Sequence, residues 1–159
     1  MLNVFVICTG NSCRSVMGEA LFNHHGQSRI RAFSAGSHPI GRINQGALAT
    51  LKRHGLPTEG YQSQSWEDFE HQPMDIVITV CDSAHGETCP VYLTKAVRAH
   101  WGVSDPGHVE GTDEEKIAAF EQTFSTLELR VKTMLELPLE TMPHDELTRK
   151  LNEIGQLTA

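Results

Sequence analysis

The chain has 159 residues, of which 39% are hydrophobic and 21% charged, a composition typical of an ordinary globular domain. This length predicts a single domain, residues 1–159, built around one hydrophobic core. Because acidic residues outnumber basic ones by 20 to 13, the net charge of −7 gives no support to a nucleic-acid partner.

The predicted elements begin with a short, almost continuous apolar run at Leu2–Cys8, typical of a strand buried on both faces. Apolar residues at helical spacing then predict a helix over Ser15–His25. A second, weaker strand is predicted at Ile30–Phe33, followed by the turn Ser34-Ala35-Gly36. The pattern of Asn44–His54 predicts a second helix.

In the second half of the chain, Met74–Val80 is the strongest strand signal after the first, and Ala96–Trp101 predicts a fourth strand. Thr112–Glu115 has the form of a capping box. The helix that it opens has one apolar stripe, formed by Ile117, Phe120, Phe124, Leu127, Val131 and Leu135. A last helix is predicted over Asp145–Ile154, within a C-terminal extension of about residues 144–155.

Strands that alternate with helices predict an α/β fold. We expect four parallel strands in one sheet, flanked by helices on both faces, which makes three layers. A phosphate-binding loop is expected after the first strand.

The four cysteines, Cys8, Cys13, Cys81 and Cys89, have no export signal before them, since no basic segment precedes the first apolar run. The apolar runs are too short to span a bilayer, which argues against a membrane partner. We therefore expect a cytoplasmic monomer with reduced thiols rather than a disulfide framework. The sequence contains no Cys-x2-Cys or His-x3-His pair, which argues against a zinc site.

The stretch Cys8-Thr9-Gly10-Asn11-Ser12-Cys13-Arg14-Ser15 joins the first strand to the first helix. Backbone N–H groups and the helix dipole favour an anion at such a junction. Gly10 permits a positive φ and Asn11 tolerates one, so successive amides can turn inward as an anion nest. Arg14 adds a planar fork that suits two oxygens of a tetrahedral oxyanion. Residues 9–15 are therefore the predicted oxyanion-binding segment.

Cys8 ends the first strand and lies at the base of this predicted cradle. There we expect its pKa to be lowered, so that it is a thiolate near neutral pH, with Ser15 donating a hydrogen bond to the sulfur. The arrangement predicts a sulfur nucleophile beneath a bound phosphate or arsenate. A buried strand-end cysteine beside a surface arginine is the plainer interpretation, but the polar loop between them favours the nucleophile.

The stretch Cys8–Ser15 resembles the phosphate loop of the low-molecular-weight protein tyrosine phosphatase fold. In particular, CTGNSCRS is similar to the cysteine-based arsenate reductases that share this fold. The resemblance covers roughly residues 2–136 and includes Ser34-Ala35-Gly36 and Trp101–Pro106. In the family the Asp-Pro loop supplies the general acid, which implies Asp105 here. Taken alone, Asp105-Pro106 would be read as a plain turn.

In the family's sheet order the first and third strands are neighbours, so Cys81 should lie near Cys8. In the arsenate reductases that the chain resembles, the first cysteine attacks arsenate, and the second attacks the thiol–arsenic adduct and releases arsenite. The third then attacks the second and leaves a disulfide for thioredoxin. The resemblance gives these roles to Cys8, Cys81 and Cys89. Seven residues separate the last two, against six in the family's best-known thioredoxin-linked members.

The alternative is a low-molecular-weight protein tyrosine phosphatase, which hydrolyses phosphomonoesters through a cysteinyl-phosphate intermediate. Gly107-His108 follows the Asp-Pro pair where those phosphatases typically carry tyrosines, which weakens this alternative. Residual phosphatase activity remains compatible with the resemblance. A silent oxyanion-binding regulator is a third class, but a mere binder needs neither the nucleophile Cys8 nor the acid Asp105. Cys13 is read as structural.

The resemblance implies no tightly bound cofactor and an external thiol reductant. Cys89 favours thioredoxin, although glutaredoxin-linked and mycothiol-linked relatives share much of this site. Some family members bind a potassium ion beside the loop. Asn11, Glu19 and Ser34 match ligand positions of that ion, whereas Ser65 stands where the family has an aspartate, so the potassium site stays open.

Overall fold

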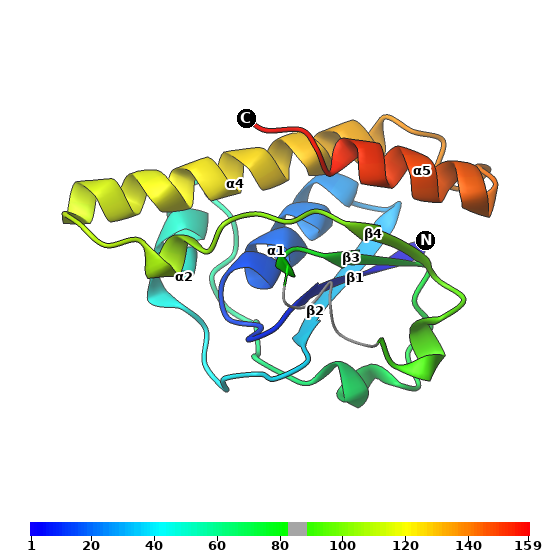
Figure 1. The fold of residues 1–159 in the computed structure, drawn as a ribbon, viewed down its shortest axis with the longest axis horizontal. Helices are drawn as coiled ribbons and strands as arrows, with labels where there is room; N and C mark the ends of the chain where they lie inside the picture. Colours follow the sequence, from blue (N-terminus) through cyan, green and yellow to red (C-terminus); the bar gives the residue numbers. More distant parts are fainter. Residues whose placement is uncertain (83–88) are drawn as a thin grey trace.

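The computed structural model of the protein describes residues 1–82 and 89–159. Its centre is a sheet of four parallel strands in the order β2-β1-β3-β4 (Figure 1). The strands are β1 (Leu2–Cys8), β2 (Ile30–Gly36), β3 (Ile76–Thr79) and β4 (Val97–His100). The predicted four-stranded parallel sheet, with the first and third strands side by side, is confirmed.

The long helices pack together on one side of this sheet, together with the 3-10 helix η3 (Pro106–His108), whereas the 3-10 helices η1 (Trp66–Phe69) and η2 (Val91–Leu93) lie on the other side (Figure 1). The α-helices are α1 (Arg14–Gly26), α2 (Gln45–Arg53), α4 (Asp113–Leu135) and α5 (His144–Ile154). Among the described residues, both faces of the sheet therefore carry helices, but the α-helices lie on one face and only short 3-10 helices lie on the other.

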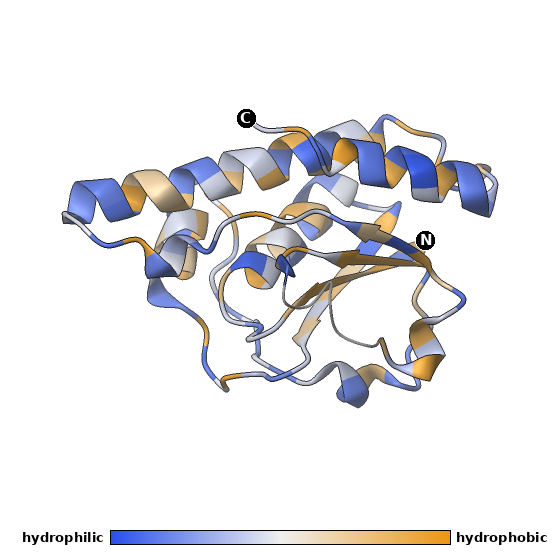
Figure 2. Ribbon diagram, in the orientation of Figure 1, coloured by the Kyte–Doolittle hydropathy of each residue, from blue (hydrophilic) through white to orange (hydrophobic). Residues whose placement is uncertain are grey.

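Alternate residues of β1 pack against these two layers. A Cβ added at Gly18 of α1 would lie 2.9 Å from the side chain of Val6, which shows how closely α1 approaches the sheet. On the opposite face the ring of Phe69 in η1 lies 5.0 Å from that of Phe5 and 5.7 Å from that of Phe33. Strand β1 is buried from Val4 onwards, and the ribbon is hydrophobic along the strands at the centre of the sheet (Figure 2). The loop that follows β1 lines a cavity.

Two predicted features differ from the structure. Strand β2 continues to Gly36 instead of ending at Phe33, because the whole SAG turn pairs with β1 up to the Cys8–Gly36 register. The capping box at Thr112 is present, but Ile117 on the predicted apolar stripe is 47% exposed. Burial in α4 begins only at Phe120, since the first turns of this helix extend past the edge of the core.

The C-terminal helix α5 packs beside β4, the edge strand. Its backbone accepts a hydrogen bond from the Trp101 indole at Leu151 O (2.8 Å). An edge strand with open N–H and C=O groups invites association, and α5 covers it. Within the described residues, no helix combines the length and the apolar character needed to cross a membrane.

Candidate active site

The predicted oxyanion loop surrounds a cavity of about 360 Å³ at the carboxyl end of β1. Asn11 has a φ of +45°, the left-handed conformation expected at this position. Residues of the loop line one side of the cavity and residues of two other segments line the other. The lining residues are Cys8, Thr9, Gly10, Asn11, Ser12, Cys13, Arg14, Ile40, Asn44, Asp105, Gly107 and His108. The structure therefore brings Asp105 together with the loop, as predicted from the resemblance.

The carbonyl groups of the loop turn away from its centre. Segment 38–44 donates backbone hydrogen bonds to Thr9 O (2.9 Å), Gly10 O (3.1 Å) and Ser12 O (2.9 Å). In a planar trans peptide the N–H of the next residue points opposite to such a carbonyl. The amides of residues 10, 11 and 13 are thereby directed inward, as an oxyanion cradle requires.

The last residue of β2, Gly36, has no room for a side chain. A Cβ added there would lie 2.4 Å from Thr9 O and 2.9 Å from Cys8 O. The loop backbone therefore passes against β2 so closely that any side chain at this position would displace it. The SAG turn supports the shape of the loop through this contact.

The pKa of Cys8 contradicts the expectation of a lowered value. The hydrogen bond with Cys81 raises the pKa of the buried Cys8 thiol most, and burial raises it further. The Arg14 guanidinium and the Gly10 backbone oppose this shift without reversing it. The expectation considered the loop alone, whereas the sheet places a second thiol against the first. In this arrangement Cys8 keeps its proton at neutral pH.

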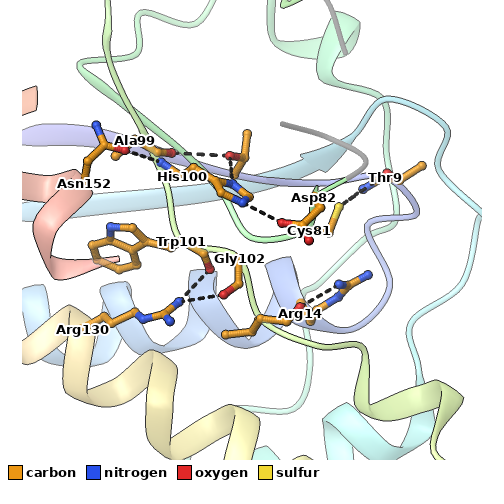
Figure 3. Close-up of polar contacts among 12 residues, drawn as sticks. Thr9, Arg14, Cys81, Asp82, Ala99, His100, Trp101, Gly102, Arg130 and Asn152 are labelled. Atoms are coloured by element: carbon orange, nitrogen blue, oxygen red, sulfur yellow. Dashed lines mark hydrogen bonds and ion pairs between the residues drawn. The ribbon is translucent and has the colours of Figure 1, made fainter. Parts of the chain in front are cut away.

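Cys81 follows β3 and is held at the loop by Thr9 (Figure 3). The Thr9 N–H donates to Cys81 Sγ at 3.2 Å, and the Thr9 hydroxyl lies 3.5 Å from the same sulfur. Cys81 is buried, with 2% of its surface exposed. The predicted proximity of the thiols after the first and third strands is therefore found in the structure.

Ser15 does not have the contact that was expected for it. Its hydroxyl accepts a hydrogen bond from Asn11 Nδ2 (2.8 Å), and among the described residues it makes none with Cys8. Ser15 is the second residue of α1 and is fully buried, so its role is to hold the loop in shape. Cys13 is also buried, and burial raises the pKa of its thiol to about 12, which fits its structural interpretation.

Arg14 opens α1 and reaches toward the loop that follows β4. Its Nη1 donates to Val103 O at 2.9 Å, and its Nη2 lies 3.7 Å from Asp105 Oδ2. Asp105 caps η3 by accepting from Gly107 N (2.9 Å), and His108 Nε2 lies 3.5 Å from its other oxygen. The predicted oxyanion-binding cation and the predicted general acid thus form an ion pair, and both line the cavity.

Cys89, the third predicted redox thiol, lies just after residues 83–88, which are outside the described part of the chain. It is partly exposed and precedes Pro90 and η2. A second cavity, of about 460 Å³, is lined by Cys81 and Asp82 and shares Arg14, Asp105 and His108 with the first. Cys81 therefore lines this adjoining cavity and contacts Thr9, which lines the loop cavity.

The three residues considered for potassium form a hydrogen-bonded cluster behind the loop. Ser34 Oγ donates to Glu19 Oε1 (2.5 Å) and accepts from Asn11 Nδ2 (3.0 Å). Asn11 Oδ1 accepts from Gln64 N (2.9 Å), and Ser65 caps η1 instead of contributing a carboxylate. The structure brings these three side chains together without a carboxylate at Ser65, and a potassium ion there stays a prediction. Burial raises the pKa of Glu19 to about 7.

Sequence reasoning did not find the contact between Asp82 and His100, whose Oδ1 and Nε2 are 2.8 Å apart. Asp82 follows β3 whereas His100 is the last residue of β4, and their spacing in the sequence carries no signal. A prediction that the third and fourth strands are neighbours would have placed Asp82 near His100.

The chain is similar to known proteins of one family in both sequence and structure. The family model of low molecular weight phosphotyrosine protein phosphatase matches residues 3–151. An arsenate reductase of Halalkalibacterium halodurans is 35% identical over 133 residues, covering 84% of this chain and 94% of that protein. The arsenate reductase of Bacillus licheniformis is 33% identical over 133 residues with the same coverage. The solved structure of an arsenate reductase in the phosphate binding state is 25% identical, has a TM-score of 0.69 and covers 86% of this chain and 98% of its own.

Proposed function

This chain belongs to the low molecular weight phosphotyrosine protein phosphatase family, and we propose that within this family it acts as an arsenate reductase. The observation that carries the proposal is the second thiol beside the nucleophile: Cys81 Sγ accepts from Thr9 N–H and contacts Cys8. Phosphoester hydrolysis needs one cysteine. Reduction of arsenate needs two electrons, which a pair of adjacent thiols supplies as it becomes a disulfide.

The first step uses Cys8, Arg14 and Asp105. Because Cys8 keeps its proton in this site, we infer that the entering arsenate dianion takes that proton and leaves a thiolate beside the Arg14 guanidinium. The thiolate attacks arsenic, a sulfur–arsenic bond forms, and one oxygen leaves as water with a proton from Asp105. Arsenic remains in the +5 state in this adduct.

The second step uses Cys81. Its thiolate attacks the sulfur of Cys8, and the sulfur–arsenic bond breaks with its electron pair staying on arsenic. Arsenic leaves as arsenite in the +3 state, and the two thiols are oxidised to a Cys8–Cys81 disulfide. The two electrons lost by sulfur equal those gained by arsenic.

The third step restores the oxyanion site. The Cys89 thiolate attacks Cys81, displaces the Cys8 thiolate and leaves a Cys81–Cys89 disulfide. A dithiol protein then reduces that disulfide, and we propose thioredoxin because Cys89 supplies a partly exposed thiol outside the loop cavity. Such a cycle needs a reducing compartment, which supports a cytoplasmic location.

The test is a coupled assay with arsenate, thioredoxin, thioredoxin reductase and NADPH, set beside hydrolysis of p-nitrophenyl phosphate. Arsenate-dependent NADPH consumption is the expected result. Hydrolysis of the aryl phosphate without any arsenate-dependent NADPH consumption would replace the reductase with a phosphatase.

A further inference from the structure

Asp82, the residue that follows Cys81, is bound by a histidine of the neighbouring strand. His100 Nε2 lies 2.8 Å from Asp82 Oδ1, as Figure 3 shows. A carboxylate only accepts hydrogen bonds, so Nε2 carries the hydrogen. The Asp82 side chain is 94% exposed, whereas that of His100 is 23% exposed. The histidine is therefore the fixed partner of this pair.

His100 has two further contacts, one made by its ring and one by its backbone. Its Nδ1 lies 2.8 Å from Thr79 Oγ1, and in the neutral ring Nδ1 accepts from that hydroxyl. Its backbone N–H donates to Asn152 Oδ1 of α5 at 3.0 Å. Thr79 is the last residue of β3, so the ring of His100 lies across the exits of β3 and β4.

The loop after β4 has a glycine, Gly102, beside the contact between Asp82 and His100. A Cβ added at Gly102 would lie 2.7 Å from His100 Nε2 and 2.8 Å from Asp82 Oδ1. The buried Arg130 fixes this loop by donating from Nη1 to Trp101 O (2.7 Å) and Gly102 O (3.3 Å). The Asp82–His100 contact therefore occupies a space that the surrounding backbone defines.

We propose that His100 is a positioning residue for Cys81: through Asp82 it holds the chain that leaves β3, so that the Cys81 sulfur stays beside Cys8. Thr9 fixes the sulfur itself, and His100 fixes the next residue along the chain. Attack by one sulfur on another depends on a position set to within about 1 Å. The inference rests on the proposed function only in giving Cys81 the role of second nucleophile.

The contribution of His100 has a limited size, because Asp82 is exposed to solvent. An exposed ion pair changes a rate or an equilibrium constant by at most a few-fold. We therefore expect loss of His100 to slow Cys8–Cys81 disulfide formation about fivefold. Binding of an oxyanion in the loop should not change. This separation distinguishes a positioning residue from one that merely stabilises the fold.

The experiment uses the full chain carrying Cys89→Ser, in which a Cys8–Cys81 disulfide is not resolved. Two oxidants are compared, arsenate in a single turnover and the thiol oxidant diamide, and the disulfide is quantified by peptide mapping. His100→Ala removes the donor, and His100→Gln keeps an N–H that can reach Asp82. A matched control is His25→Ala, because His25 makes a similar 2.9 Å contact with Glu128 at the far end of α1.

The expected result is that His100→Ala slows disulfide formation about fivefold with both oxidants. His100→Gln should recover most of that rate, and His25→Ala should not change it. Inorganic phosphate should still protect Cys8 from an alkylating agent in all three variants, at phosphate concentrations within twofold of those that protect the parent protein. The inference is overturned if His100→Ala forms the disulfide at the unaltered rate, or if phosphate protection falls in parallel with it.

The diamide reaction separates this inference from the proposed function. If the protein reduces no arsenate but His100→Ala still slows the diamide reaction, the positioning role holds and the arsenate reductase is wrong. If arsenate is reduced and His100→Ala is as fast as the parent protein with both oxidants, the reductase holds and the positioning role is wrong.

Discussion

At the scale of single residues, the chemistry of this site depends on what lies beside each thiol. A loop with Gly10, Asn11 and Arg14 lowers the pKa of a cysteine when it acts alone. In this protein the neighbouring thiol and burial outweigh those groups, and the pKa of Cys8 is raised. In the proposed reaction, the reactive thiolate therefore forms when the oxyanion binds.

Replacing the neighbouring thiol should change the reactivity of Cys8 in a defined direction. Because the hydrogen bond with Cys81 is the largest cause of the raised pKa, Cys81→Ala should lower the pKa of Cys8. The measurement is the pH dependence of Cys8 alkylation by iodoacetamide, followed by peptide mapping. The midpoint should move to lower pH in the variant, with Cys13→Ala as the control. An unchanged midpoint would mean that burial alone sets the pKa.

Asp105 should act as an acid and not only as a helix cap. A carboxylic acid protonates the departing oxygen and an amide does not, so Asp105→Asn should slow adduct formation by about 10²–10⁴-fold. Asparagine keeps an oxygen that can accept from Gly107 N, so the cap on η3 should survive. Single-turnover kinetics with arsenate give the rate. A loss of less than about threefold would reduce Asp105-Pro106 to a turn.

At the scale of elements, the hydrophobic pattern predicted the four strands and the four α-helices of the described residues but none of the three 3-10 helices, and side-by-side placement was only partly predictable. Apolar runs identified β1 and β3, and the capping box located the start of α4. The length of β2 and the exposure of Ile117 depend on which neighbours a segment meets, and no local pattern contains that information.

The same limit applies to the candidate site. The predicted oxyanion loop is contiguous in the sequence, so its position between β1 and α1 and its positive φ at Asn11 were predictable. The contact between Asp82 and His100 and the raised pKa of Cys8 arise where separate strands end together. Such features require the sheet order, which came from the family resemblance and not from spacing.

Glu19 links α1 to β2 through Ser34, and its pKa gives a pH-dependent stability. The folded-state pKa of about 7 lies above the ordinary value of 4.5, because burial disfavours the charged carboxylate. The folded protein therefore binds one proton more than the unfolded chain between these pH values, and stability falls as pH rises through them. The contribution is at most about 3 kcal/mol.

Glu19→Gln should remove that slope, because the amide is neutral at every pH and its oxygen still accepts from Ser34. Chemical denaturation of both proteins between pH 5 and pH 8 measures the effect. The variant should equal the natural sequence near pH 5 and exceed it in stability near pH 8. If the stability of the natural protein does not fall relative to that of the variant between pH 5 and pH 8, Glu19 is already charged in the folded state at pH 5.

At the scale of the whole molecule, the parallel sheet is what brings the thiols together. Cys8 and Cys81 follow adjacent strands, and the carboxyl ends of parallel strands meet at one edge. Helix α5 packs beside the edge strand β4, and its Asn152 accepts a hydrogen bond from the backbone N–H of His100. The C-terminal helix, to which the sequence assigned no role, is therefore connected through His100 to Asp82, the residue after Cys81.

The order of the thiol cascade is testable on this molecule by trapping its intermediates. In the proposed cascade each cysteine is attacked only by the next, so removing one thiol should stop the sequence of reactions at the preceding disulfide. One turnover with arsenate in the absence of reductant, followed by peptide mapping, should give Cys81–Cys89 in the natural sequence. Cys89→Ser should give Cys8–Cys81 instead, and Cys81→Ser should release no arsenite catalytically.

Cys13→Ser is the matched control, since Cys13 lines the loop cavity but has no place in the cascade. It should still yield the Cys81–Cys89 disulfide. Hydrolysis of an aryl phosphate, which needs only Cys8, Arg14 and Asp105, should survive in Cys81→Ser. If Cys81→Ser and Cys89→Ser both turn over arsenate at the natural rate with thioredoxin, neither thiol resolves the adduct. The sheet would then bring Cys81 to Cys8 for a purpose other than electron transfer.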